Sequence, residues 1–298
     1  MRKILSFGSL NIDHVYQVDH FVQPGETTAA LRLDLLPGGK GLNQSVALAR
    51  AGAEVYHAGK IGPDGTNLVK LLAEAGVHTE YIDKTGSTTG MAMIQVNRAG
   101  QNCILINHGA NGEITEEFID SVLSHFGKGD ILLVQNEINA LSSLIGKSFE
   151  QGLRIALNPS PMDSGIAKLP LDKVTWFILN EIEGESLTGE KEPEKIAETL
   201  LRRYPHSKVV LTLGKGGVLY KDAGTVCRHG IYKVPVVDTT GAGDTFTGFF
   251  LACITSGRSI EESLRLASVA SSIAVSRKGA AVAIPTLEEV EKTHLEMQ

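Results

Sequence analysis

Four short apolar runs in the middle of the chain limit the folds open to it. They occupy residues 131–134, 155–157, 177–179 and 209–213, with helical stretches such as residues 194–203 between them. Apolar runs of this length are typical of parallel strands that are buried on both faces. Their alternation with helices predicts a three-layer α/β/α fold with a mostly parallel central sheet.

A polar residue follows or ends each of these apolar runs. The four are Glu137, Asn158, Asn180 and Thr212. Because α/β folds bind their ligands in the crevice beyond the carboxyl ends of the strands, we expect these side chains to line a binding site.

Two polar-rich regions break the α/β pattern. Residues 15–36 alternate between apolar and polar types, and residues 90–97 and 102–107 do the same around a turn. Alternation of this kind predicts exposed antiparallel strands, and the second region predicts a hairpin. We therefore expect a single domain over residues 1–298, with lid strands inserted at about 14–37 and 90–108 that pair as one small sheet.

The bulk properties exclude several classes of protein. The formal net charge is −6, with acidic and basic residues interspersed, which argues against nucleic-acid binding. No stretch approaches the roughly 20 apolar residues of a membrane span. The three cysteines are widely spaced, which is typical of reduced thiols in a cytoplasmic protein.

The strongest chemical signal is the stretch from Val237 to Phe246. Small residues at 241–243 allow backbone N–H groups to converge at the start of an apolar helix, which makes an anion site. Asp244 lies just inside that helix, where a carboxylate beside a bound phosphate is suited to accept a hydroxyl proton. The alternative is a glycine-rich turn followed by an ordinary acid in the first turn of a helix.

Two further stretches offer groups for a polyhydroxylated ligand. In residues 38–43 the glycines permit close approach, and Lys40 and Asn43 offer hydrogen-bond donors, although the spacing is not that of a P-loop. Asn11 and Asp13 follow the first strand, Ile4–Phe7, and are suited to binding a polyol. A capping or turn pair is the alternative for these two residues.

Together these stretches resemble the ribokinase-like sugar kinases of the phosphofructokinase B type. The resemblance runs from Gly8 to about Pro285, and it depends on two signatures, residues 38–43 and residues 238–244. The resemblance implies that Asp244 is the catalytic base and that the amides of Gly241, Ala242 and Gly243 form the anion hole. The residues it assigns to the sugar are Asn11, Asp13, Gly38, Gly39, Lys40, Asn43, Glu137 and Asp244.

The resemblance also implies cofactors and the residues that hold them. ATP and Mg²⁺ are assigned to Asn180, Glu183, Thr212, Gly214, Lys215, Gly217 and Gly243. A monovalent cation, K⁺, is assigned to Asp238, Thr240, Ala274, Arg277 and Gly279, mostly through carbonyl groups. The chain departs from the family at Ala283, where a serine is common near the cation.

The implied activity is transfer of the γ-phosphoryl group of ATP to the primary 5-hydroxyl of D-ribose or a close pentose. The edges of the lid strands would expose unpaired backbone groups, so we further expect a homodimer that forms through the lid. Alternatives are a kinase of the same family for another sugar or a nucleoside, and a non-catalytic sugar or nucleotide sensor. A dinucleotide-dependent oxidoreductase is excluded, because no G-x-G-x-x-G motif follows the first strand.

Overall fold

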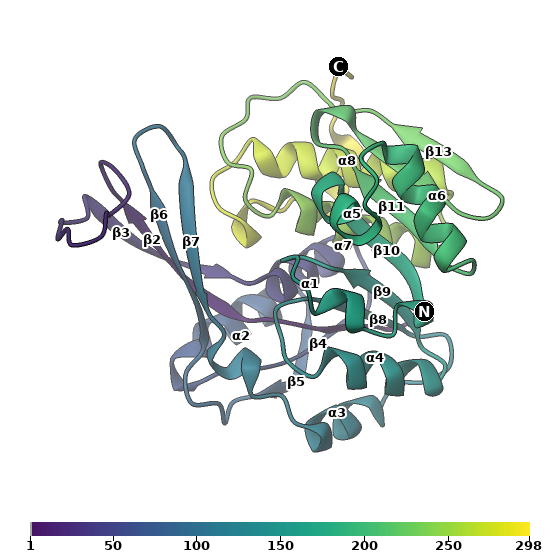
Figure 1. Ribbon diagram of the computed structural model, residues 1–298, viewed down its shortest axis with the longest axis horizontal. Helices are drawn as coiled ribbons and strands as arrows, with labels where there is room; N and C mark the ends of the chain where they lie inside the picture. The colour runs from purple at the N-terminus through teal and green to yellow at the C-terminus, as the bar shows by residue number, and fades with distance from the viewer. Residues whose placement is uncertain (1) are drawn as a thin grey trace.

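A nine-stranded sheet forms the centre of the molecule in the computed structural model, which describes residues 2–298 (Figure 1). Its strands are β1 (Ile4–Phe7), β4 (Val55–Lys60), β5 (His78–Asp83), β8 (Ile131–Gln135), β9 (Arg154–Asn158), β10 (Val174–Asn180), β11 (Lys208–Thr212), β12 (Val218–Lys221) and β13 (Val226–His229). The spatial order is β13-β12-β11-β10-β9-β8-β1-β4-β5. Neighbouring strands from β11 to β5 are parallel, whereas β12 and β13 add an antiparallel edge. The predicted fold class is confirmed.

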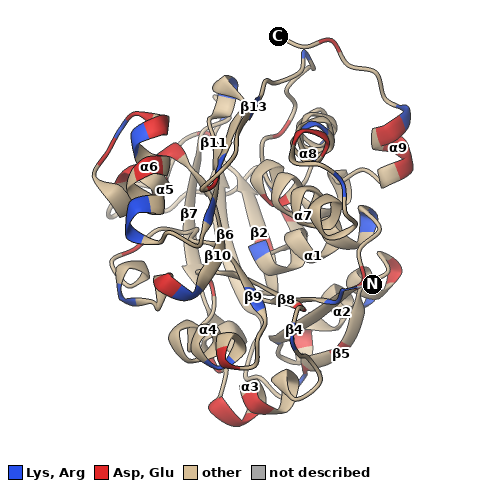
Figure 2. Ribbon diagram, turned by 90° about the vertical axis from the view of Figure 1, so that its right-hand side faces the viewer, with Lys and Arg blue, Asp and Glu red and all other residues tan. Residues whose placement is uncertain are grey.

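Helices cover both faces of this sheet (Figure 2). On one face lie α1 (Lys40–Arg50), α2 (Thr66–Glu74), α7 (Ala242–Thr255), α8 (Ile260–Val275) and α9 (Leu287–Lys292). On the other lie α3 (Glu116–Leu123), α4 (Leu141–Glu150), α5 (Glu181–Thr188) and α6 (Pro193–Arg203). Ile4 of β1 belongs to the apolar core of the first face, and Leu5 and Phe7 belong to that of the second. Burial on both faces explains why the central strands are continuously apolar.

A separate four-stranded sheet forms the lid. Its strands are β2 (Asn11–Gln17), β3 (Arg32–Gly38), β6 (Gly90–Val96) and β7 (Asn102–Asn107), in the order β3-β2-β6-β7. The predicted hairpin is present as β6 and β7, and parallel pairing of β2 with β6 joins the two polar-rich regions. The strand β2 starts earlier than predicted, at Asn11, which pairs with both Gly38 and Gly90. Asn11 and Asp13 therefore belong to a strand and not to a turn.

The starts of two helices shape the site. Helix α1 begins at Lys40, directly after Gly39, whose φ of 93° brings the chain from β3 into the helix. Helix α7 begins at Ala242, so Asp244 lies in its first turn. The two helices pack so closely that a Cβ on Gly248 would overlap with Ala47. Glycine at 248 is therefore what allows the starts of α1 and α7 to meet.

The distribution of surface charge and the lengths of the helices concern nucleic acid and membranes, the two partners that the sequence argued against. Acidic and basic residues are interspersed over the helices in Figure 2. Within residues 2–298, no helix combines the length and apolar character needed to cross a bilayer.

Candidate active site

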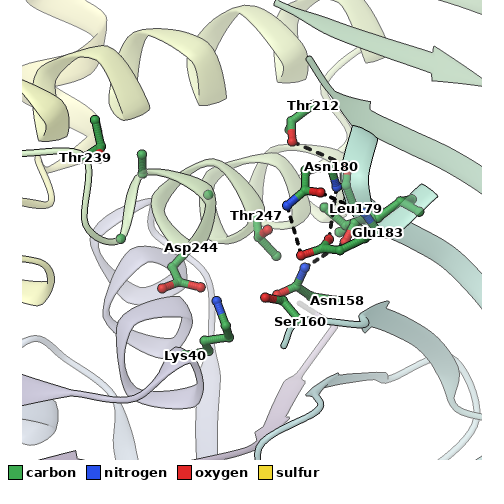
Figure 3. Close-up of a pocket in the computed structure, with 14 residues that line it drawn as sticks. Lys40, Asn158, Ser160, Leu179, Asn180, Glu183, Thr212, Thr239, Asp244 and Thr247 are labelled. Carbon is green, nitrogen blue, oxygen red and sulfur yellow. Dashed lines mark hydrogen bonds between the residues drawn. The ribbon is translucent and has the colours of Figure 1, made fainter. Parts of the chain in front are cut away.

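A cleft lies beyond the carboxyl ends of β9, β10 and β11, beside the start of α7 (Figure 3). Residues from both signatures and from the strand ends line it, among them Lys40, Asn180, Glu183, Thr212, Gly241 and Asp244. Figure 3 shows Lys40 and Asp244 pointing toward each other, with Asn180 and Glu183 on the opposite wall. The fold thus brings together predicted residues that lie up to about two hundred positions apart in the chain.

The start of α7 forms one wall of the cleft. Gly241 precedes the helix with a φ of 74°, and no side chain caps the helix. The N–H groups in the first turn of a helix have no partner within it, and the helix dipole adds positive character there. Ala280 lies 3.1 Å from the place where a Cβ on Gly241 would stand. Residues 241–243 therefore lie at the positive end of α7, where the N–H of Ala242 donates to the carbonyl group of Thr239 at 3.3 Å.

Asp244 is held in place by two amides from α1. Its side chain is 6% exposed. Asn43 Nδ2 donates to Asp244 Oδ2 at 3.0 Å, and Gln44 Nε2 donates to Asp244 Oδ1 at 2.8 Å. Each carboxylate oxygen therefore has one fixed donor and keeps a lone pair for another group.

Lys40 carries the positive charge of the site. Burial would lower the pKa of Lys40, but the carboxylates of Asp244, Glu137 and Glu183 outweigh burial and raise that pKa. The ammonium group is therefore stably charged, and it faces the carboxylate of Asp244 (Figure 3).

Glu137 joins the end of β8 to the start of α1. Its Oε2 accepts a hydrogen bond from Ser9 Oγ and one of 2.9 Å from the backbone N–H of Lys40. Burial raises the pKa of Glu137, and the charge of Lys40 and these hydrogen bonds only partly offset that effect. Ser9 follows β1, and the strand order reverses between β1 and β8, which is where open α/β sheets bind ligands.

Asn11 and Asp13 lie on the lid strand β2 and are not among the residues that line the cleft. Asn111 Nδ2 donates to Asn11 Oδ1 at 2.7 Å, so the amide N–H group of Asn11 is the one available to a ligand. The Asp13 carboxyl lies against Gly38, where any side chain would overlap with it. Burial and the nearby Glu137 raise the pKa of Asp13 to about 7. Its charged form is therefore poorly stabilised by the protein alone.

Asn180 and Glu183 form a capping box at the start of α5. Asn180 Oδ1 accepts from Glu183 N at 2.9 Å, and Glu183 Oε2 accepts from Asn180 N at 3.0 Å. Thr212 lines the same cleft, whereas Gly214, Lys215 and Gly217 lie in and after the following turn, outside the cleft lining.

Of the residues assigned to a monovalent cation, Ala274 lies in the last turn of α8 and the others lie in two loops that Asp238 joins. Its Oδ1 accepts from Thr240 N at 3.0 Å and Oγ1 at 2.7 Å, and its Oδ2 accepts from Gly279 N at 3.0 Å. The carboxylate that the resemblance assigned to the cation is thus engaged within the loops. The carbonyl group of Ala274 accepts from the backbone N–H of Arg277, whose side chain binds Glu289 and donates to the carbonyl group of Ala283 at 3.5 Å.

Several polar residues of the site were not singled out from the sequence. Ser9 and Asn111 orient Glu137 and Asn11, as described above. Gln44 donates to Asn158 Oδ1 at 3.1 Å as well as to Asp244, and Gln135 Nε2 donates to Gln44 Oε1 at 2.7 Å. A lone amide has no characteristic spacing, and only the position of Gln44 directly after Asn43 in the first signature could have pointed to it.

Comparisons with known proteins agree with this geometry. The family model for the pfkB family of carbohydrate kinases matches residues 1–287. The chain is 35% identical to a ribokinase of Haemophilus influenzae, with 97% of each chain covered. It is 36% identical to a ribokinase of Bacillus subtilis, with 98% of this chain and 99% of the relative covered. A structure of Arabidopsis thaliana ribokinase complexed with ribose and ATP has a TM-score of 0.85 at 30% identity, covering 98% of this chain and 97% of the other.

The raised pKa of Asp13 predicts how stability depends on pH. A carboxyl whose pKa is higher in the folded state than its value of 3.8 when exposed stabilises the fold at low pH, and that contribution is lost as pH rises through about 7. We therefore expect Asp13→Asn to be more stable than the wild type by about 4 kcal/mol above pH 7, since one pKa unit corresponds to about 1.4 kcal/mol. The difference should shrink toward pH 4.

Urea unfolding of the ligand-free protein between pH 4 and pH 8 measures this difference. Asp64→Asn is the control: hydrogen bonds from Thr89 lower the pKa of Asp64, so this variant should be less stable than the wild type at neutral pH. A constant difference between Asp13→Asn and the wild type across this range would contradict the raised pKa.

Proposed function

The chain belongs to the pfkB family of carbohydrate kinases, and on that premise we propose that it phosphorylates D-ribose at the primary 5-hydroxyl with ATP. The ribokinases of Haemophilus influenzae and Bacillus subtilis match it over nearly their whole lengths, which supports the choice of sugar. The single observation that carries the mechanism is the buried carboxylate of Asp244 beside the uncapped start of α7.

We assign Asp244 the role of base. Phosphoryl transfer needs a group that accepts the hydroxyl proton and donors that stabilise negative charge on the phosphoryl oxygens. Asp244 supplies the first, and the amides of residues 241–243 supply the second from the adjacent turn. Lys40, which faces Asp244, adds a fixed positive charge on the other side of the cleft.

The polar groups around α1 and β2 suit a small polyol. Asn43 Oδ1 is buried and accepts no hydrogen bond from any residue of the described chain, so a sugar hydroxyl that donates would satisfy it. Asn11 offers an N–H donor, and Asp13 and Glu137 offer carboxylate acceptors. Sugar hydroxyls that donate to Asp13 would also stabilise its buried charged form. Sugar binding is therefore coupled to the charge of this side chain.

Nucleotide and metal fit the opposite wall. Carboxylates of Asp244, Glu137 and Glu183 surround the single ammonium of Lys40, so the cleft carries an excess of negative charge that a divalent cation would balance. We assign Asn180 and Glu183 to Mg²⁺ and the phosphates, and Thr212 with the turn at residues 214–217 to the nucleotide. Magnesium, when bound, neutralises charge on the transferring phosphoryl group.

Another sugar or a nucleoside is the second candidate within the family, because the matching family model covers carbohydrate kinases in general and a deoxyribokinase of Salmonella typhi is 29% identical to the chain. A sensor without catalysis is disfavoured by the buried Asp244, since a binding protein has no need for a base at the anion site.

Replacing the base tests the mechanism. We expect Asp244→Asn to lower kcat by about 10²–10⁴, the usual contribution of general-base catalysis, because the amide cannot accept the proton. Sugar affinity, measured by calorimetry, should fall far less. A variant that keeps near-normal turnover would show that Asp244 is not the base.

A panel of sugars with ATP and magnesium, scored by ADP release, tests the substrate. We expect D-ribose to give the highest kcat/KM among pentoses and hexoses, and 2-deoxyribose to be clearly poorer. A site built to bond a hydroxyl leaves its own polar groups unpaired when that hydroxyl is missing. Equal turnover of deoxyribose, or preference for a nucleoside, would contradict the ribose assignment but leave the kinase class intact.

We also propose that K⁺ binds between the loops joined by Asp238, through carbonyl groups of residues 240, 274 and 279. Ala283 is buried and has no hydroxyl to offer. We therefore expect activation by K⁺ over Na⁺, and we expect Ala283→Ser to lower the K⁺ concentration that gives half activation. If the activity of the wild type and of Ala283→Ser stays constant as the K⁺ concentration rises from trace levels, the proposed cation site is wrong.

The lid supports a proposed homodimer. Its outer strands β3 and β7 each have an unpaired edge. They also expose apolar side chains, including Leu35 at 60%, Ile104 at 53% and Leu105 at 68%. Such edges and patches are typical of interfaces. Sedimentation should give twice the chain mass of 31.8 kDa, and Leu105→Lys should shift the protein toward monomer. A wild-type monomer at micromolar concentration would contradict the proposal.

A further inference from the structure

We propose that Gln44 is a positioning residue for the base, acting through a chain of side-chain amides that runs from Gln135 to Asp244. The inference rests on the proposed function, in which Asp244 accepts the proton. Gln44 lies one residue beyond the sugar-binding signature and does not line the cleft. It therefore acts on the reaction only through the carboxylate that it holds.

Asp244 determines which amide group donates and which accepts in this series of hydrogen bonds. An ionised carboxylate only accepts hydrogen bonds, so Gln44 must turn its Nε2 toward Asp244 Oδ1, at 2.8 Å. The second hydrogen of Nε2 points to Asn158 Oδ1, at 3.1 Å. The Oε1 of Gln44 must then face a donor, which is Gln135 Nε2 at 2.7 Å. Each polar atom of Gln44 thus has a partner, and only one orientation of its amide satisfies all three.

The partners of Gln44 are anchored in the central sheet. Gln135 ends β8 and is fully buried, as is Gln44 itself. Asn158 ends β9, and its Nδ2 donates to the carbonyl group of Ile178 in β10 at 2.9 Å. The chain of amides therefore connects the ends of three parallel strands to the first turn of α7, with α1 between them.

This connection has a direct consequence for catalysis. Proton transfer requires the base and the hydroxyl to lie within hydrogen-bond distance with aligned lone pairs. Asn43 restrains only Oδ2 of Asp244. With that hydrogen bond alone, the carboxylate could still turn and move Oδ1. The bond from Gln44 to Oδ1 removes this freedom and leaves the remaining lone pairs aimed at the cleft.

The test replaces Gln44 and measures kcat and sugar affinity separately. We expect Gln44→Met, which keeps the length but removes the amide, to lower kcat by about 10- to 100-fold, the scale on which small misplacements of catalytic groups act. Affinity for D-ribose, measured by calorimetry, should change by less than about twofold, because Gln44 lies outside the cleft lining. Gln44→Glu is the near-isosteric second variant, and it should lose at least as much kcat because an acceptor then faces the carboxylate.

Ser45→Ala provides a matched control. Ser45 is the next residue of α1 and is also fully buried, but its hydroxyl binds His57 and not the base. It should cost stability without lowering kcat by more than about twofold. An equal loss of kcat in Ser45→Ala and both Gln44 variants would show that general damage to α1 explains the effect, and would overturn the proposal.

A double-mutant cycle separates this proposal from the proposed function. If Gln44 acts through the base, Gln44→Met should change kcat by less than about threefold in an Asp244→Asn background, because coupled residues do not add. The same loss in both backgrounds, or a wild-type kcat in folded Gln44→Met and Gln44→Glu, would overturn the role of Gln44. Full activity of Asp244→Asn alone would instead overturn the base itself.

Discussion

The close packing of α1 against α7 is the constraint on which the rest of the structure depends. Gly248 allows the two helices to approach until Ala47 fills the place of a side chain. That approach brings Asn43 and Gln44 into hydrogen-bond distance of Asp244, about two hundred residues later in the chain. Because α1 follows directly from the lid strand β3, the same contact also fixes the lid side of the site relative to the anion site of α7.

Electrostatics explains why this site is costly for the fold and useful for the reaction. Asp244, Glu137 and Glu183 act on a single ammonium, Lys40, and burial raises the pKa of Glu137 and of Asp13 on the neighbouring lid strand. Asp244 and Glu137 already accept hydrogen bonds from the protein, whereas burial and the nearby Glu137 disfavour the charged form of Asp13. Sugar hydroxyls and a divalent cation would supply donors and positive charge, so ligand binding and the electrostatic balance of the site depend on each other. Sites arranged for charge stabilisation commonly reduce stability in this way.

Much of the fold could be predicted from the sequence because its signals are local. Continuous apolar runs identified the parallel strands, and alternation identified the hairpin of β6 and β7. The two signatures located Lys40 and Asp244, which line one cleft, and Asn43, which donates a hydrogen bond to Asp244. The sequence did not show that α1 begins at Lys40, because that start depends on the carboxylate of Glu137, ninety-seven residues away. Gln44, Gln135 and Asn111 were missed for the same reason: a single amide gains its role only from partners on distant strands.

The central claim is that Asp244, held by the amides of α1, receives the proton of the primary hydroxyl. A crystal structure with D-ribose and a non-hydrolysable ATP analogue measures it most directly. The account predicts that the 5-hydroxyl oxygen lies about 2.6–3.2 Å from an oxygen of Asp244, the distance required of a general base. It also predicts that the terminal phosphoryl group lies against the amides of residues 241–243. A bound sugar whose primary hydroxyl faces Asp13 or Glu137, with Asp244 outside hydrogen-bond distance, would contradict the account.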